Sequence, residues 1–274
     1  MEDERIAWPA SPAWARVTGG MGSYTPENAS VGAEFDFERF SAEAGLNVPL
    51  GEIVEASISV RGVRGSADVT SPVDGGDIKA EGVGIAFGAS VIGTNAWYVK
   101  GRFSVTNYEL DIESSTLGQL KAGVDALGRF MDLEAGRRIQ LSETMKLTPR
   151  AWVTHSAFDV DAFTDSVDTR VSLDDMSRLT GGAGMAAETV RPAGNGELSL
   201  RGSLGVERVF RGAQTSVDVS GEMLSSRSAG TRLLLGLGGT YRQNRFSLTA
   251  DFSATGLGSD DQQYSGRTTF GINF

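Results

Sequence analysis

The residues that could do chemistry are few, and they are poorly placed for it. The only histidine, His155, is followed by Ser156 and then by Asp159, and these are the three residue types of a serine hydrolase. His155 and Ser156 are neighbours in a segment of alternating apolar residues, so their side chains point to opposite faces of a strand. We therefore predict no catalytic residues and no enzymatic activity.

Metal and cofactor sites are equally unsupported. With no cysteine and a single histidine, the chain lacks the ligands of a thiolate or multi-histidine centre. A group of acidic residues has a spacing that matches no calcium loop, and a solvated surface is expected for it: Asp159, Asp161, Asp165, Asp168, Asp174 and Asp175. The pairs Gly19-Gly20 and Gly238-Gly239 open no helix and are not phosphate loops. We predict no metal and no cofactor.

Charge and hydropathy narrow the class of protein further. The 274 residues include 35 Asp and Glu against 25 Lys and Arg, a net charge of −10, which argues against a nucleic-acid partner. No apolar run approaches the roughly 18 residues of a membrane helix. Met1–Pro12 is acidic and lacks the apolar core of a signal peptide.

The dominant pattern is strict alternation of apolar residues with polar or small ones. Phe246, Leu248 and Phe252 share one face of such a segment, and Ser247 and Asp251 lie on the other. This period of two is typical of a half-buried strand. About twelve segments follow it, and we expect strands over 13–24, 32–48, 53–66, 79–92, 96–112, 127–140, 146–160, 178–190, 197–210, 231–243, 245–256 and 264–274.

The connections between these segments alternate in length. Short ones fall near 49–52, 93–95, 141–145, 191–196 and 243–245, whereas long ones fall near 67–78, 113–126, 161–177, 211–230 and 257–263. An outer-membrane barrel has short periplasmic turns and longer extracellular loops. We therefore predict an all-β fold, a closed antiparallel transmembrane barrel of about 12 strands. We expect residues 13–274 to form one domain, and residues 1–12 are too short to form a second.

The polar face of the strands is predicted to line the lumen of the barrel. Charged side chains would be costly inside a soluble core, but they can line a wet pore or pair across it to make the barrel rigid. The candidates are Arg16, Glu43, Arg61, Lys100, Arg102, Glu134, Arg138, Arg150, Glu188, Arg201, Arg242 and Asp251. About twelve strands leave a narrow pore.

Several stretches, taken in order, carry a resemblance to a known family. They are Trp14–Gly20, Leu133–Arg138, Leu147–Ala151, Arg170–Asp175 and Leu235–Tyr241, followed by a terminal Phe274. With these stretches the chain resembles the C-terminal translocator domain of autotransporters, the type V secretion proteins of Gram-negative bacteria. The resemblance covers roughly residues 13–274. It implies an integral outer-membrane barrel that carries an N-terminal passenger to the cell surface without ATP or cofactor, and a chain that is part of a longer precursor.

The resemblance also implies partners. These are outer-membrane lipids, the barrel-assembly machinery and the protein's own passenger, while a complete closed barrel favours a monomer. Phe270, Ile272 and Phe274 are expected to form a C-terminal sorting signal that adds as a strand to an open sheet edge. Two alternatives stay open: a passenger-less outer-membrane pore or adhesin acting through its extracellular loops, and a soluble acidic β-sandwich.

Overall fold

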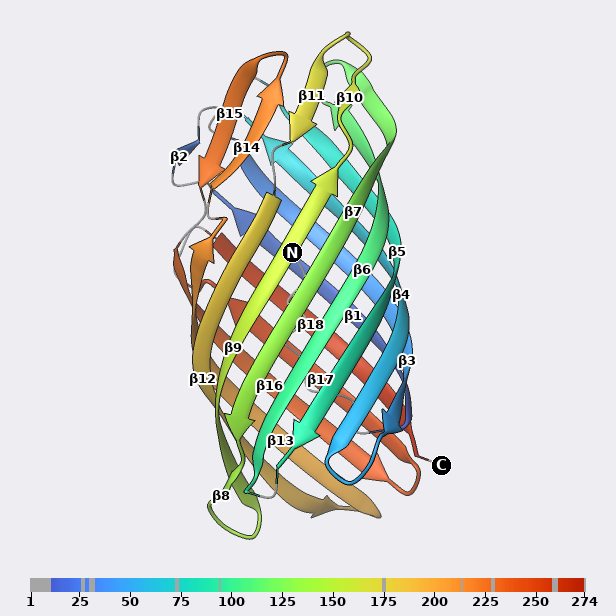
Figure 1. The fold of residues 1–274 in the computed structure, drawn as a ribbon, viewed down its shortest axis with the longest axis vertical. Coiled ribbons are helices and arrows are strands. Elements are labelled where there is room, and N and C mark those ends of the chain that lie inside the picture. The colour runs from blue at the N-terminus through green and yellow to red at the C-terminus, as the bar shows by residue number, and fades with distance from the viewer. Residues whose placement is uncertain are drawn as a thin grey trace.

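Twelve long antiparallel strands close into one barrel in the computed structural model of the chain (Figure 1). In barrel order they are β1 (Ala13–Tyr24), β3 (Glu34–Pro49), β4 (Val54–Thr70), β5 (Gly76–Ile92), β6 (Trp97–Ser114), β7 (Gly118–Arg137), β9 (Met145–Val160), β12 (Met176–Ala193), β13 (Gly196–Arg211), β16 (Thr231–Gln243), β17 (Phe246–Thr255) and β18 (Asp261–Ile272). The structure describes residues 11–25, 28–29, 33–71, 74–93, 95–173, 176–212, 214–227, 230–257 and 261–273.

Closure of the barrel is made by the first and last strands. β18 pairs with β1 along its whole length, from Ala13 opposite Ile272 to Tyr24 opposite Asp261. β12 pairs with both β9 and β13, so each of these twelve strands has a neighbour on either side. Closure satisfies the backbone hydrogen bonds that an open sheet edge would leave exposed. The predicted twelve-stranded antiparallel barrel is confirmed.

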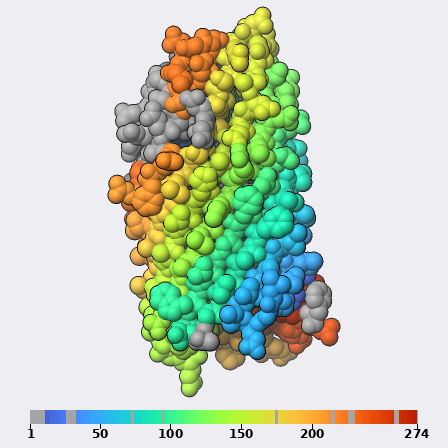
Figure 2. All heavy atoms as spheres, in the orientation of Figure 1, coloured from blue at the N-terminus to red at the C-terminus, as the bar shows by residue number. Residues whose placement is uncertain are grey.

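An apolar band surrounds the outside of the barrel. On β5 the exposed side chains are Val83, Ile85 and Phe87, while the alternate residues Gly84 and Ala86 are buried and face inward. The outer face of the other strands carries leucine, valine and phenylalanine in the same way, and on the side seen in Figure 2 the strands form a continuous wall. This inverted alternation, apolar outside and polar inside, is the pattern of a barrel that contacts lipid.

The alternation reverses face near one end of the barrel. On β4 the outer side chains change from Ile58 and Val60 to Arg64 and Asp68, while Val69 now points inward. Leu110, Val124 and Ala126 form a small apolar core inside the neighbouring part of β6 and β7. Polar side chains outside and apolar ones inside suit strands that continue into water. The strands therefore extend beyond the apolar band.

Two of the loops expected from the sequence are wrong because of this reversal. Segments 67–78 and 113–126 are mostly strand, because β4 runs to Thr70, β5 starts at Gly76, β6 runs to Ser114 and β7 starts at Gly118. The connections between these strands are therefore 71–75 and 115–117. An alternation that changes face weakens the apolar period on which the strand prediction depended.

The longer loops are at the same end as these extensions. The connections 25–33, 161–175 and 212–230 contribute to a small second sheet of β10 (Phe163–Thr164), β11 (Arg170–Leu173), β14 (Gln214–Val219), β15 (Glu222–Arg227) and β2 (Asn28–Ala29), at the top of Figure 1. The opposite end has short turns such as 194–195 and 244–245, together with β8 (Ile139–Gln140). Within the described ranges, no helix is long and apolar enough to cross a membrane.

Candidate functional site

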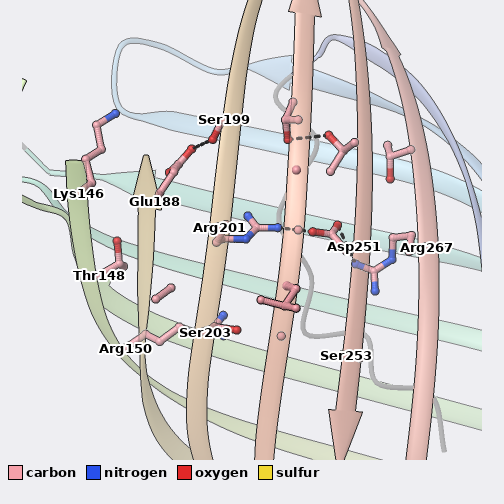
Figure 3. Close-up of a pocket in the computed structure, with 18 of the residues that line it drawn as sticks. Lys146, Thr148, Arg150, Glu188, Ser199, Arg201, Ser203, Asp251, Ser253 and Arg267 are labelled. Carbon is pink, nitrogen blue, oxygen red and sulfur yellow. Dashed lines mark hydrogen bonds and ion pairs between the residues drawn. The ribbon is translucent and has the colours of Figure 1, made fainter. Parts of the chain in front are cut away.

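A polar cavity of ≈590 Å³ occupies the inside of the barrel, nearer the end with the short turns. Its wall is built from inward-facing side chains of neighbouring strands, among them β9, β12, β13, β17 and β18, and Figure 3 shows Arg201 and Asp251 pointing toward one another along this wall. Eight of the twelve predicted pore-lining residues are on this wall: Lys100, Glu134, Arg138, Arg150, Glu188, Arg201, Arg242 and Asp251. The other four lie on the inner surface outside this lining, as described below: Arg16, Glu43, Arg61 and Arg102.

Glu134 on β7 is the centre of one ion cluster in the cavity. Its carboxylate lies 3.1 Å from the Lys100 Nζ and 3.2 Å from an Arg150 Nη1, one from each flanking strand. The Tyr98 hydroxyl donates a third bond to it at 2.7 Å, and the Arg138 guanidinium lies 5.4 Å from the Tyr98 ring centroid. Glu134 is almost fully buried, so two cations and a hydroxyl replace its water shell.

Asp251 on β17 is the centre of a second cluster. Arg201 of β13 donates to its Oδ1, and an Arg267 nitrogen of β18 lies 3.9 Å from its Oδ2. Arg201 and Asp251 are on strands separated by β16, where Gly238 occupies the position between them. A Cβ at Gly238 would collide with the Asp251 carboxylate and lie 3.2 Å from the Arg201 guanidinium. Glycine is therefore what allows this contact across a strand.

Glu43 on β3 is the centre of the third cluster, at the inner surface of β1 to β6. It accepts a 2.9 Å bond from the Arg16 Nε, a 2.7 Å bond from an Arg102 Nη2 and a bond from the Ser59 hydroxyl. Arg102 reaches Glu43 from β6, past β4 and β5. Arg16 and Glu43 are only 5% exposed at their side chains, so this network has little access to water.

Beside the Glu43 cluster, Arg61 also makes a contact that crosses an intervening strand. From β4 its guanidinium donates two bonds to the Thr106 hydroxyl of β6, at 3.0 and 2.7 Å. Gly84 of β5 is beneath this contact, and a Cβ there would lie 2.5 Å from the Val105 carbonyl oxygen. The remaining predicted residues bond locally: Glu188 accepts from Ser199, and Arg242 lies 3.7 Å from Glu197.

One buried ion network includes none of the residues that were predicted to line the pore. Arg232 donates to Glu207 and to Asp261, each at 3.0 Å, and the Trp152 indole donates to Glu207 at 3.3 Å. Glu207, Arg232 and the Arg267 described above all have the inward parity, so the alternation alone could have included them. Asp261 fell in an expected loop, and nothing in the sequence indicated its role.

The first described residue, Ser11, is inside the barrel. It is 2% exposed, its hydroxyl lies 3.0 Å from that of Ser247, and its carbonyl accepts a 3.0 Å bond from the Asn47 side chain. Both partners belong to the inner surface, and Asn47 also accepts a bond from the Trp14 indole. The chain therefore reaches β1 from the lumenal side of the wall.

The C-terminal strand has its apolar residues on the outer face. Phe270 is exposed and stacks on Phe246, with ring centroids 5.8 Å apart, while Ile272 is half-buried. Phe274 lies outside the described residues. In the closed barrel the strand is paired with β1 along its whole length and with β17 from Gln263 to Ile272.

Carboxylates dominate the outer surface beyond the apolar band. Asp36, Asp68 and Asp77 are side by side on adjacent strands. The pKa of Asp68 is raised because its carboxyl shares a hydrogen bond with Asp77 and faces the negative charges of Asp77 and Asp36. Asp74 differs, since bonds from the Ser114 and Thr116 hydroxyls lower its pKa.

Neither catalysis nor metal binding gains support from the geometry. His155 is exposed on the outer face of β9, and Ser156 is buried on the inner face, as the alternation predicts. Across the part of the chain that the structure describes, no three histidine or acidic side chains are grouped to hold a metal ion. Asp174 and Asp175 lie outside the described residues.

Comparison with known proteins identifies this barrel. A model of the autotransporter beta-domain family matches residues 13–253. The chain belongs to the autotransporter family. This autotransporter barrel is also 30% identical over 251 residues to the "Adhesin BmaC autotransporter" of Brucella suis, a match that covers 87% of the chain. The chain spans only 7% of that relative's length.

Solved structures agree on the fold. The barrel is similar to the transport unit of AIDA-I from Escherichia coli, with a TM-score of 0.79, 13% identity and coverage of 100% of this chain and 93% of that one. It is also similar to the translocator domain of NalP from Neisseria meningitidis, with a TM-score of 0.76, 19% identity and coverage of 96% and 89%. The protein is therefore an autotransporter translocator barrel, a transport protein integral to the Gram-negative outer membrane.

Proposed function

We propose that the polypeptide upstream of β1 passes through the lumen of this barrel and joins it to a passenger carried to the cell surface. The observation that supports this path is the position of Ser11, buried against the inner wall and bonded to Asn47 and Ser247. An even number of strands leaves both ends of the barrel domain on the periplasmic side. A chain that leaves β1 inside the lumen can return to the outside through the pore.

The polar inner surface suits such a passage. Its charges are held by partners on neighbouring strands, as at Glu134 and Asp251, so an extended chain in the cavity would face polar and charged groups on this part of the wall. Residues 1–12 would then be the end of the linker to the passenger, and residues 13–274 the translocator.

Assembly and surroundings complete the proposal. Phe270 and Ile272, with Phe274 after them, would present β18 as a strand to the barrel-assembly machinery before β1 closes the sheet. The exposed apolar band would contact outer-membrane lipids, and the closed barrel would act as a monomer. Neither nucleic acid nor a cofactor has a part in this function.

A photocrosslinking experiment on the full-length precursor tests the path directly. A benzophenone amino acid at Thr249, which lines the cavity, should capture upstream chain while the passenger is exported. The same group at the adjacent Leu248, which is exposed on the outer face, provides a matched control and should capture lipid instead. Export without any capture from Thr249 would exclude passage through the lumen. A precursor that places no upstream chain on the cell surface would instead favour the alternative, an outer-membrane pore or adhesin without a passenger.

A further inference from the structure

The lumenal ion clusters share an uneven stoichiometry. Each of the three carboxylates Glu43, Glu134 and Asp251 is bonded to or within 4 Å of two cationic side chains. A cluster of one carboxylate and two cations retains a positive charge. The network around Arg232 has no such excess, because Arg232 and the nearby Arg178 both face Glu207 and Asp261. The excess of cations is thus a property of the three clusters.

The side chains that line the cavity also carry more positive than negative charges. Its described lining residues include seven cations, of which four belong to the clusters, and five carboxylates: Lys100, Arg138, Lys146, Arg150, Arg201, Arg242 and Arg267 against Glu55, Glu134, Glu188, Glu197 and Asp251. This surplus of two positive charges occurs in a protein whose net charge is −10. The positive charge is therefore concentrated where the barrel is hollow.

We infer that the lumen selects an acidic polypeptide segment as its occupant, an inference that rests on the proposed passage of chain through the barrel. A narrow space with low-dielectric walls focuses the potential of its lining charges, so it favours an occupant of opposite sign. A polypeptide in the cavity that has several carboxylate side chains can accept hydrogen bonds from several of the lining guanidinium groups at once. The sequence before Ser11 has the matching sign, with Glu2, Asp3 and Glu4 against Arg5.

The experiment varies the charge of the chain that precedes Ser11 in the full-length precursor. The ten residues before Ser11 are replaced by a Gly/Ser-rich segment that carries several Glu, the same number of Gln, or the same number of Lys. The readouts are the rate at which the passenger appears on the surface and the melting temperature of the assembled barrel. We expect the Glu segment to raise the melting temperature above the Gln segment by about 5 °C, and the Lys segment to lower it.

A charge swap in the lumen separates electrostatics from general effects of the insert. Arg138→Glu combined with Lys146→Glu reverses the surplus on the cavity wall without removing a partner of Glu134 or Asp251, so the Lys segment should become the stabilising one. Arg170→Glu, at an exposed cation in a loop strand, makes the same kind of change outside the lumen and should leave the order unchanged.

The outcomes distinguish this inference from the proposed function. Passengers that reach the surface with equal melting temperatures for all three segments would overturn the selection of acidic chain and leave the translocation path intact. An order that fails to reverse in the lumenal double variant would overturn it as well. A passenger that never reaches the surface with any segment contradicts the proposed function itself.

Discussion

The buried carboxylate of Glu43 offers the sharpest test of what stabilises the barrel wall. The substitution Glu43→Gln keeps the shape of the side chain but removes the negative charge that Arg16 and Arg102 share. The side chains of Arg16 and Arg102 are only 5% and 10% exposed, so water cannot replace the lost charge effectively. The substitution should therefore act as the loss of one partner from a buried ion pair.

Loss of one partner from a buried pair costs about 3–5 kcal/mol of unfolding free energy. Since glutamine still accepts a hydrogen bond, the lower end of this range is expected. A matched control is Glu81→Gln, which removes the partner of Arg64 in a pair that is 74% and 68% exposed. Exposed pairs contribute about 0–1 kcal/mol, so the control should change stability very little.

Urea titration of the barrel in lipid vesicles measures both variants. Tryptophan fluorescence follows unfolding, and an unchanged slope with urea shows that the same surface is exposed. If Glu43→Gln and Glu81→Gln lowered the unfolding free energy equally, burial of the lumenal cluster could not be the source of its stability, and the reasoning would be refuted.

Three further outcomes follow from the same geometry. Gly84→Val should destabilise the barrel by about 1–3 kcal/mol because the new Cβ meets the Val105 carbonyl. Gly62→Val, whose side chain would point into open space, should change the unfolding free energy by about 0.5 kcal/mol or less. Equal urea midpoints for the two variants would contradict this expectation. Ser11→Cys with Ser247→Cys should form a disulfide in the assembled barrel, visible on a non-reducing gel of this otherwise cysteine-free chain, and a failure to oxidise would place Ser11 away from the wall. The pKa of the Asp74 carboxyl, measured by ¹³C NMR, should lie below its ordinary value of 3.8. The hydrogen bonds of the carboxylate therefore stabilise the turn above about pH 4, and this stabilisation is lost as the pH falls through the lowered pKa. A titration midpoint at or above 3.8 would be inconsistent with those bonds.

The alternation in the sequence was sufficient to predict the barrel but not the full length of its strands. Strands such as β1 and β16 have the predicted bounds, because their apolar side chains stay on one face and do not change to the other. β7 was expected from residue 127 and begins at Gly118, since its apolar residues change from the outer to the inner face near Arg129. A pattern that reverses at the edge of the membrane has no single period to detect.

Parity also placed charged residues on the inner face, but it could not indicate which of them would bond. Arg201 reaches Asp251 over a strand that separates them, and only the glycine at 238 leaves room for it. Contacts of this kind depend on the register of three strands that are distant in sequence. The lumenal position of Ser11 could not be predicted from the sequence either, because no periodic pattern precedes the first strand.

The most direct test of the account is made on intact cells that express the full-length precursor. An epitope is placed immediately upstream of this chain, and external antibody or protease is added after the barrel has assembled. Passage of the upstream chain through the lumen predicts an epitope that is accessible from outside, because the chain would then leave β1 within the barrel and emerge on the cell surface. An epitope that stays protected in a correctly assembled barrel would contradict it.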